Sequence, residues 1–150
     1  MNNNTTSNVT INNFGSEDRS YVSNDTIKHC LDNAVLVPLL MDVFFNSAHP
    51  ENHTIRHKND KLSRVVVHTD GKWVECDMNA SIDQMMKTEH NALIKYYWSP
   101  DFYGNVDIDE KAKMAALENI GKLYATKLTY FEQRRCVHSI LKNAKKEYIT

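Results

Sequence analysis

Cysteine is scarce in this sequence, long apolar runs are missing and net charge is close to zero. Each of these features excludes a class of protein. The 150 residues include three cysteines, Cys30, Cys76 and Cys136. They are far apart and odd in number, which argues against a disulfide framework. We therefore expect free thiols in a reducing, intracellular compartment.

No stretch has the roughly 20 consecutive apolar residues that a membrane-spanning helix needs. The first residues also lack the order of basic, apolar and small residues that marks a secretory signal. We therefore expect a protein that contacts no membrane.

A strong overall charge of one sign is also absent, because the formal net charge is −1. The chain as a whole has no field that would attract nucleic acid. Its two ends differ, however. Residues 1–54 carry six acids and two bases, and residues 122–147 carry seven bases and two acids. The basic end can meet phosphate groups or the acidic end of a second copy.

The sequence does contain enough apolar material for one domain, since 41% of its residues are hydrophobic. Residues 1–8 form an Asn/Thr tract with nothing to bury, and we expect a disordered tail there. Residues 9–106 are predicted to form the core domain, and residues 107–150 a long C-terminal helix.

Two short helices are predicted near the start of the core domain. The first covers residues 23–32 and is capped by Ser23 or Asn24. The second covers residues 37–45, with Pro38 in its first turn, where a missing N–H costs little. The next proline follows His49, so the segment His49-Pro50-Glu51-Asn52 is predicted to be a turn.

A β-hairpin is the strongest local signal in the chain. Residues 64–69 and 72–76 flank Asp70-Gly71, a pair that suits a turn with two positive φ angles. With a further strand candidate at 54–58, they predict a small antiparallel sheet. The two-residue turn implies four facing pairs: Val67–Val74, Val65–Cys76, His68–Trp73 and Val66–Glu75.

Helical periodicity dominates the remainder. Ser81 and Gln84 form a capping box for a helix over 82–98. A second box at 107–110 opens a helix that can run to about residue 147. Because helices average about 11–12 residues, a helix of this length either breaks into two packed helices or pairs with another chain.

We favour pairing, which predicts a homo-oligomer. Its interface would be an apolar stripe whose members are three and four residues apart. These are Leu117, Ile120, Tyr124, Leu128 and Phe131.

One loop is densely basic. Beside the aromatic Trp73, its cations can touch the backbone of a nucleic acid, although we favour a solvated surface as their explanation. The candidate contact residues are Arg56, Lys58, Lys61 and Arg64.

Histidines suggest an alternative function. His49, His53 and His57 have the spacing of helical metal ligands, but Pro50 breaks the helix. On a strand, His53 and His57 would lie about 13 Å apart. A second possibility is a ββα-metal nuclease, in which a histidine activates water and a divalent cation stabilises the leaving oxygen. It would use His53 or His68 as base and His90 or Asn91 as metal ligand.

Three stretches carry a resemblance to a known family: TINNFGSED at 10–18, FFNSAHPENHTI at 44–55 and VVVHTDGKW at 65–73. Over about residues 9–98 the chain resembles an uncharacterised domain of giant nucleocytoplasmic DNA virus proteins. That domain commonly follows a C2H2 zinc finger and an Asn-rich linker. These 150 residues hold no Cys-x2-Cys…His-x3-His pattern, so the resemblance does not imply DNA binding through a finger.

The predicted fold class is α+β: a small antiparallel β-hairpin sheet packed with helices, followed by a long C-terminal helix. The predicted function is a non-enzymatic oligomerisation or interaction protein. The resemblance places it in the host-cell cytoplasm, a viral factory or the virion, associated with DNA or with virion assembly. We expect no cofactor, no resident metal and no small-molecule substrate.

Overall fold

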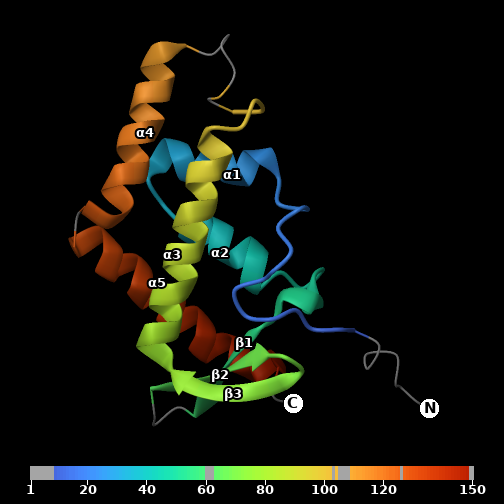
Figure 1. Cartoon of the computed structure of the whole chain (residues 1–150). Coiled ribbons are helices and arrows are strands. Elements are labelled where there is room, and N and C mark those ends of the chain that lie inside the picture. Colours follow the sequence, from blue (N-terminus) through green and yellow to red (C-terminus); the bar gives the residue numbers. More distant parts are fainter. Residues whose placement is uncertain (1–8, 60–62, 103, 105–108, 126, 149–150) are drawn as a thin grey trace.

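A computed structural model describes residues 9–59, 63–102, 104, 109–125 and 127–148, without the side chains of 59, 124–125, 127–129 and 144–148. A three-stranded sheet lies at one end of the molecule, and the helices stack on one side of it (Figure 1). This arrangement confirms the α+β fold class.

The two N-terminal helices confirm their predictions. α1 (Asn24–Asn33) begins after Ser23, whose hydroxyl accepts a hydrogen bond from the Thr26 amide. α2 (Val37–Phe44) has Pro38 in its first turn. The predicted turn after His49 contains the short 3-10 helix η2 (Pro50–Asn52).

The sheet has the order β1-β2-β3 and is antiparallel throughout. Its strands are β1 (Ile55–Asn59), β2 (Arg64–Thr69) and β3 (Lys72–Asp77). Asp70 and Gly71 have φ angles of 50° and 80°, as the hairpin prediction requires. All four predicted cross-strand pairs are present.

α3 (Met78–Tyr97) begins four residues before the predicted start at 82. The cap is Asp77, the last residue of β3, whose carboxylate accepts a hydrogen bond from the Ala80 amide at 2.9 Å. Ser81 is buried inside the first turn and its hydroxyl donates to the Asp77 carbonyl. The prediction of Ser81 as cap was therefore wrong, because the helix begins one turn earlier and Asp77 caps its first turn.

The C-terminal segment consists of two helices, α4 (Glu110–Ala125) and α5 (Lys127–Tyr148). They run in different directions (Figure 1), so the prediction of one unbroken helix to about 147 was wrong. α4 packs against α1 and α3, and α5 packs against β1 and α3. The alternative of two packed helices is the one the chain adopts. Predicted positions 107 and 108, like residues 1–8, lie outside the described residues.

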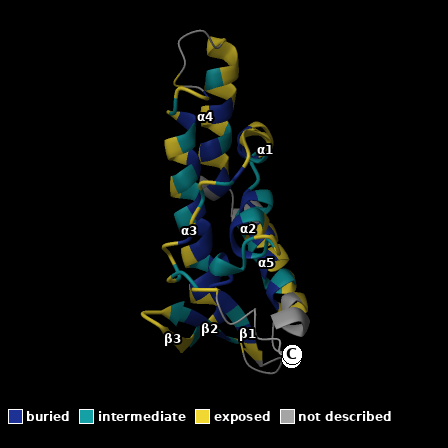
Figure 2. Cartoon of the chain, turned by 90° about the vertical axis from the view of Figure 1, so that its right-hand side faces the viewer, coloured by how far each residue is buried: buried dark blue, intermediate teal, exposed yellow. Residues whose placement is uncertain are grey.

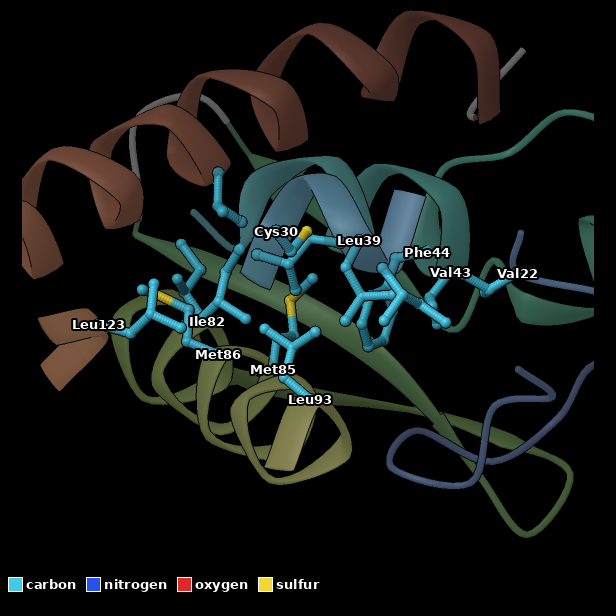
Figure 3. Packing of buried hydrophobic residues seen from close by; sticks show 14 of the residues in the cluster. Val22, Cys30, Leu39, Val43, Phe44, Ile82, Met85, Met86, Leu93 and Leu123 are labelled. Atoms are coloured by element: carbon cyan, nitrogen blue, oxygen red, sulfur yellow. The ribbon is translucent and has the colours of Figure 1, made fainter. Parts of the chain in front are cut away.

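The core is one continuous cluster that lies between the helices and reaches the sheet through Ile55, Val65 and Val67. Buried residues are dark blue in Figure 2. Figure 3 shows its centre, where side chains of α3 point toward those of α1 and α2. α4 and α5 contribute to the same cluster through Ala116, Ile120, Leu123, Val137 and Leu141. Packing is thus shared across position 106, where the core domain was predicted to end. No described helix is both long and apolar enough to cross a bilayer.

Candidate functional site

A buried polar cluster joins the N-terminal segment to α3. Glu89 lies in the middle of α3 with a side chain that is 0% exposed. The Arg19 guanidinium donates to both of its carboxylate oxygens, with Nε 2.8 Å from Oε1. A further Arg19 nitrogen donates to the Glu17 carbonyl at 3.0 Å. Two oppositely charged groups from distant parts of the sequence therefore form a buried, bidentate pair.

Glu17 and Asn52 extend this cluster. The Glu17 carboxylate accepts hydrogen bonds from the Gly15 amide and the Thr54 hydroxyl. The Asn52 side chain, fully buried, bonds to both the amide and the carbonyl of Asp18 and to the Tyr21 hydroxyl. These bonds fasten the N-terminal segment to the turn before β1. Their role is structural.

Burial and pairing act on the ionisation of this cluster in opposite ways. Burial raises the pKa of Glu89, and the Arg19 hydrogen bonds only partly oppose this. The same hydrogen bonds raise the pKa of Arg19 above its ordinary value. Burial also raises the pKa of Tyr96, which lies beside the pair. The guanidinium is thus firmly charged.

A cavity of about 480 Å³ opens beside this pair. Its cations are Arg19 and Lys95, but Glu17 and Glu89 balance them, so the local charge selects neither anions nor cations. Arg19 also directs most of its donors at Glu89 and Glu17. The lining residues are Gly15, Arg19, Thr88, Asn91, Ala92, Lys95 and Tyr96.

Each histidine that the nuclease hypothesis would use forms a hydrogen bond with a backbone carbonyl. Nε2 of His53 is 2.8 Å from the Asn46 oxygen, Nδ1 of His68 is 3.0 Å from the Asn12 oxygen, and Nε2 of His90 is 2.9 Å from the Ile120 oxygen. Because a carbonyl only accepts, these nitrogens carry their protons. The three rings bind three different segments.

The other metal candidates are also dispersed. His49 stacks on Tyr21 and pairs with Glu51, whereas His57 is buried on the inner face of β1. Asn91 is an exposed residue of α3 beside the 480 Å³ cavity. Within the described ranges, no three His, Cys, Asp or Glu side chains come close enough to hold a metal ion.

The predicted nucleic-acid contacts lie on the outer face of the sheet, opposite the buried Val65 and Val67. Lys58 and Arg64 both pair with Glu75, whose pKa they lower. The Arg56 guanidinium lies 4.1 Å from the centre of the Trp73 ring. This face is aromatic and basic, but its groups already bind one another. Lys61 lies outside the described residues.

An exposed apolar patch runs along α3 and α4. The Tyr97 hydroxyl donates to the Lys113 carbonyl, and His90 bonds to Ile120, so the two helices lie antiparallel in contact. Beside this seam, four large apolar side chains face solvent. We call them the α3–α4 patch: Ile94 (36% exposed), Trp98 (62%), Met114 (61%) and Leu117 (41%).

The predicted oligomer stripe is divided by this arrangement. Leu117 belongs to the α3–α4 patch, and Phe131 on α5 is 47% exposed. Ile120 is buried in the core of its own chain, so a partner cannot reach it. The side chains of Tyr124 and Leu128 lie outside those described. The predicted stripe required one straight helix. Because α4 and α5 run in different directions, Leu117 and Phe131 do not lie along one helix face.

A second depression, of about 420 Å³, lies between the start of α3 and α5. It combines an exposed aromatic ring with basic side chains. The lining residues are Asn79, Phe131, Arg134, Arg135 and His138.

The three cysteines differ in exposure. Cys30 is buried, and burial raises the pKa of its thiol to about 11. Cys76 is half-buried and Cys136 is exposed.

Comparison of the chain with family models, with curated proteins and with solved structures finds no match. The interpretation of its surfaces therefore depends on their geometry alone. Sequence reasoning overlooked Ile94, Trp98 and Met114 as surface residues. The spacing of four between Ile94 and Trp98, off the buried stripe of α3, was the available signal.

Proposed function

We propose that this protein is a non-enzymatic interaction module that self-associates through the α3–α4 patch. The observation that carries this proposal is the exposure of four large apolar side chains on two helices that pack against each other. Isolated exposed apolar residues are ordinary, but a group centred on tryptophan and methionine is typical of a binding surface.

The chemistry of the α3–α4 patch suits a second copy of the same chain. In a two-fold interface the same patch meets itself, so an apolar surface is its own complement. Trp98 is the most exposed of the four and belongs to the residue type that most often dominates binding energy. Self-association in DNA-associated complexes or in virion assembly is the role that the sequence resemblance implies.

The nuclease alternative has weaker support. It needs a base and a metal ligand at one phosphate. His53, His68 and His90 instead bond to backbone carbonyls of three separate segments.

Light scattering over a hundredfold range of protein concentration tests the proposal. We expect a dimer or larger species. The paired substitution Trp98→Gln and Met114→Gln should weaken its association at least about tenfold, because it removes the most exposed apolar side chains. Met41→Gln, an equally simple change at an exposed residue of α2, is the matched control and should leave the mass unchanged. A wild-type protein that is monomeric at every concentration would overturn the proposal.

A further inference from the structure

The depression on α5 has a regular origin in the sequence. Five residues of α5 lie on one face of the helix, because the last four follow the first by three, four, seven and eleven positions. They are Phe131, Arg134, Arg135, His138 and Lys142. We call them the α5 stripe. The first four line the depression, and Lys142 follows one turn beyond.

The α5 stripe is electropositive. Arg134 pairs with Asp83 at 3.4 Å, and Asp83 also accepts the Tyr130 hydroxyl. Across the part of the chain that the structure describes, neither Arg135 nor Lys142 forms an ion pair with an acid. Burial, together with the neighbouring Lys142 and Arg134, lowers the pKa of His138. The positive charge beside the depression therefore comes from Arg134, Arg135 and Lys142, whereas the lowered pKa keeps the His138 ring neutral at pH 7, where it can still donate a hydrogen bond.

Phe131 gives the stripe a second chemical character. Its ring is 47% exposed and touches Tyr130 edge-on, with ring centres 5.8 Å apart. One side of an aromatic ring is thus open beside several cations. That combination matches a nucleotide, whose base stacks on a ring while its phosphate meets a cation.

The outer face of the sheet is less suited to this ligand. There Arg56 already covers Trp73, and Glu75 already pairs with Lys58 and Arg64. A nucleic acid would have to displace these interactions. Among the described side chains of the α5 stripe, only Arg134 pairs with an acid.

The length of the stripe indicates the size of the ligand. From Phe131 to Lys142 the helix rises about 16 Å, at about 1.5 Å per residue. With a rise of about 3.4 Å per nucleotide, this length corresponds to about five nucleotides. A mononucleotide would reach only part of it.

We propose that the α5 stripe binds single-stranded nucleic acid. A base stacks on Phe131, and successive phosphates contact Arg135, His138 and Lys142. The stripe is separate from the α3–α4 patch that carries the proposed self-association.

Fluorescence anisotropy with a labelled oligothymidylate of about 12 nucleotides tests this assignment. We expect Phe131→Ala to weaken binding about tenfold, through the lost stack. Arg135→Gln should also weaken binding and should reduce the slope of log affinity against log salt by about 0.7, the share of one phosphate contact. Both residues are exposed, so the fold should tolerate the changes. Lys111→Gln, at an exposed residue of α4, is the control and should leave affinity unchanged.

Three outcomes would overturn the proposal. The first is no binding at low salt, and the second is unchanged affinity in both variants. The third is equally tight binding of an abasic oligonucleotide or of polyglutamate, which would make the stripe a general anion surface. Light scattering of Phe131→Ala separates the two proposals, because we expect the oligomer to persist while binding weakens. A lost oligomer together with weakened binding would count against the α3–α4 patch alone.

Discussion

Two regions of the molecule differ in which side chains they bury. The junction of the N-terminal segment with α3 buries charged groups, whereas the helical surfaces expose large apolar ones. At the junction of the N-terminal segment with α3, the charged groups Arg19 and Glu89 are paired and largely buried. On α3, α4 and α5, large apolar and basic side chains face solvent. A cluster of ionisable residues therefore indicates a binding site only where its groups are not already hydrogen-bonded to one another.

Removal of the buried Arg19–Glu89 pair should have the greatest effect on stability. Arg19→Ala should lower the free energy of unfolding by about 3 kcal/mol, because it leaves the Glu89 carboxylate buried without its partner. Urea denaturation measures the change. Lys28→Ala, at the exposed pair with Asp32, should cost at most about 0.5 kcal/mol. Equal losses in the two variants would mean that burial of the pair is unimportant.

A smaller effect should appear in the pH dependence of stability. The folded-state pKa of Glu89 is raised by burial, so the folded state binds more protons than the unfolded state above the ordinary carboxyl pKa of about 4.3. The contribution of Glu89 to stability is therefore greatest in acid and falls as pH rises through the raised pKa. Comparing urea unfolding of the wild type and Glu89→Gln from about pH 4 to 7 isolates it. A difference that grows in favour of the wild type with rising pH would contradict this sign.

A third test leaves the sequence unchanged and compares how fast the three cysteines react. Alkylation at neutral pH should modify Cys136 first, Cys76 more slowly and Cys30 only after unfolding. Cys30 is buried with a thiol pKa of about 11, so almost no thiolate forms. Mass spectrometry of digested samples over time gives the order. Early modification of Cys30 in the folded protein would show that the core opens near α1.

Local signals were enough for most of the elements. Ser23 caps α1, Pro38 opens α2 and Asp70-Gly71 turns the hairpin, each through bonds within a few residues. The start of α3 was placed too late because two capping residues compete, and Asp77 at the end of β3 is the one positioned to cap.

The candidate surfaces were less predictable. Leu117 and Phe131 were identified from helical spacing and are exposed, but Ile120 with the same spacing is buried. The difference depends on α1 and α3, which cover one side of α4. The basic residues near the hairpin were found, yet their pairing with Glu75 depends on strand register.

The α+β class, the hairpin register and the N-terminal helices follow from local sequence, because they depend on bonds between near neighbours and on the alternation of apolar residues. The pairing of Arg19 with Glu89, 70 residues away, follows only from the folded arrangement of the chain. That arrangement also decides where the C-terminal segment changes direction and which apolar side chains stay exposed. Packing between elements settles such features, and packing depends on the shape of the whole core.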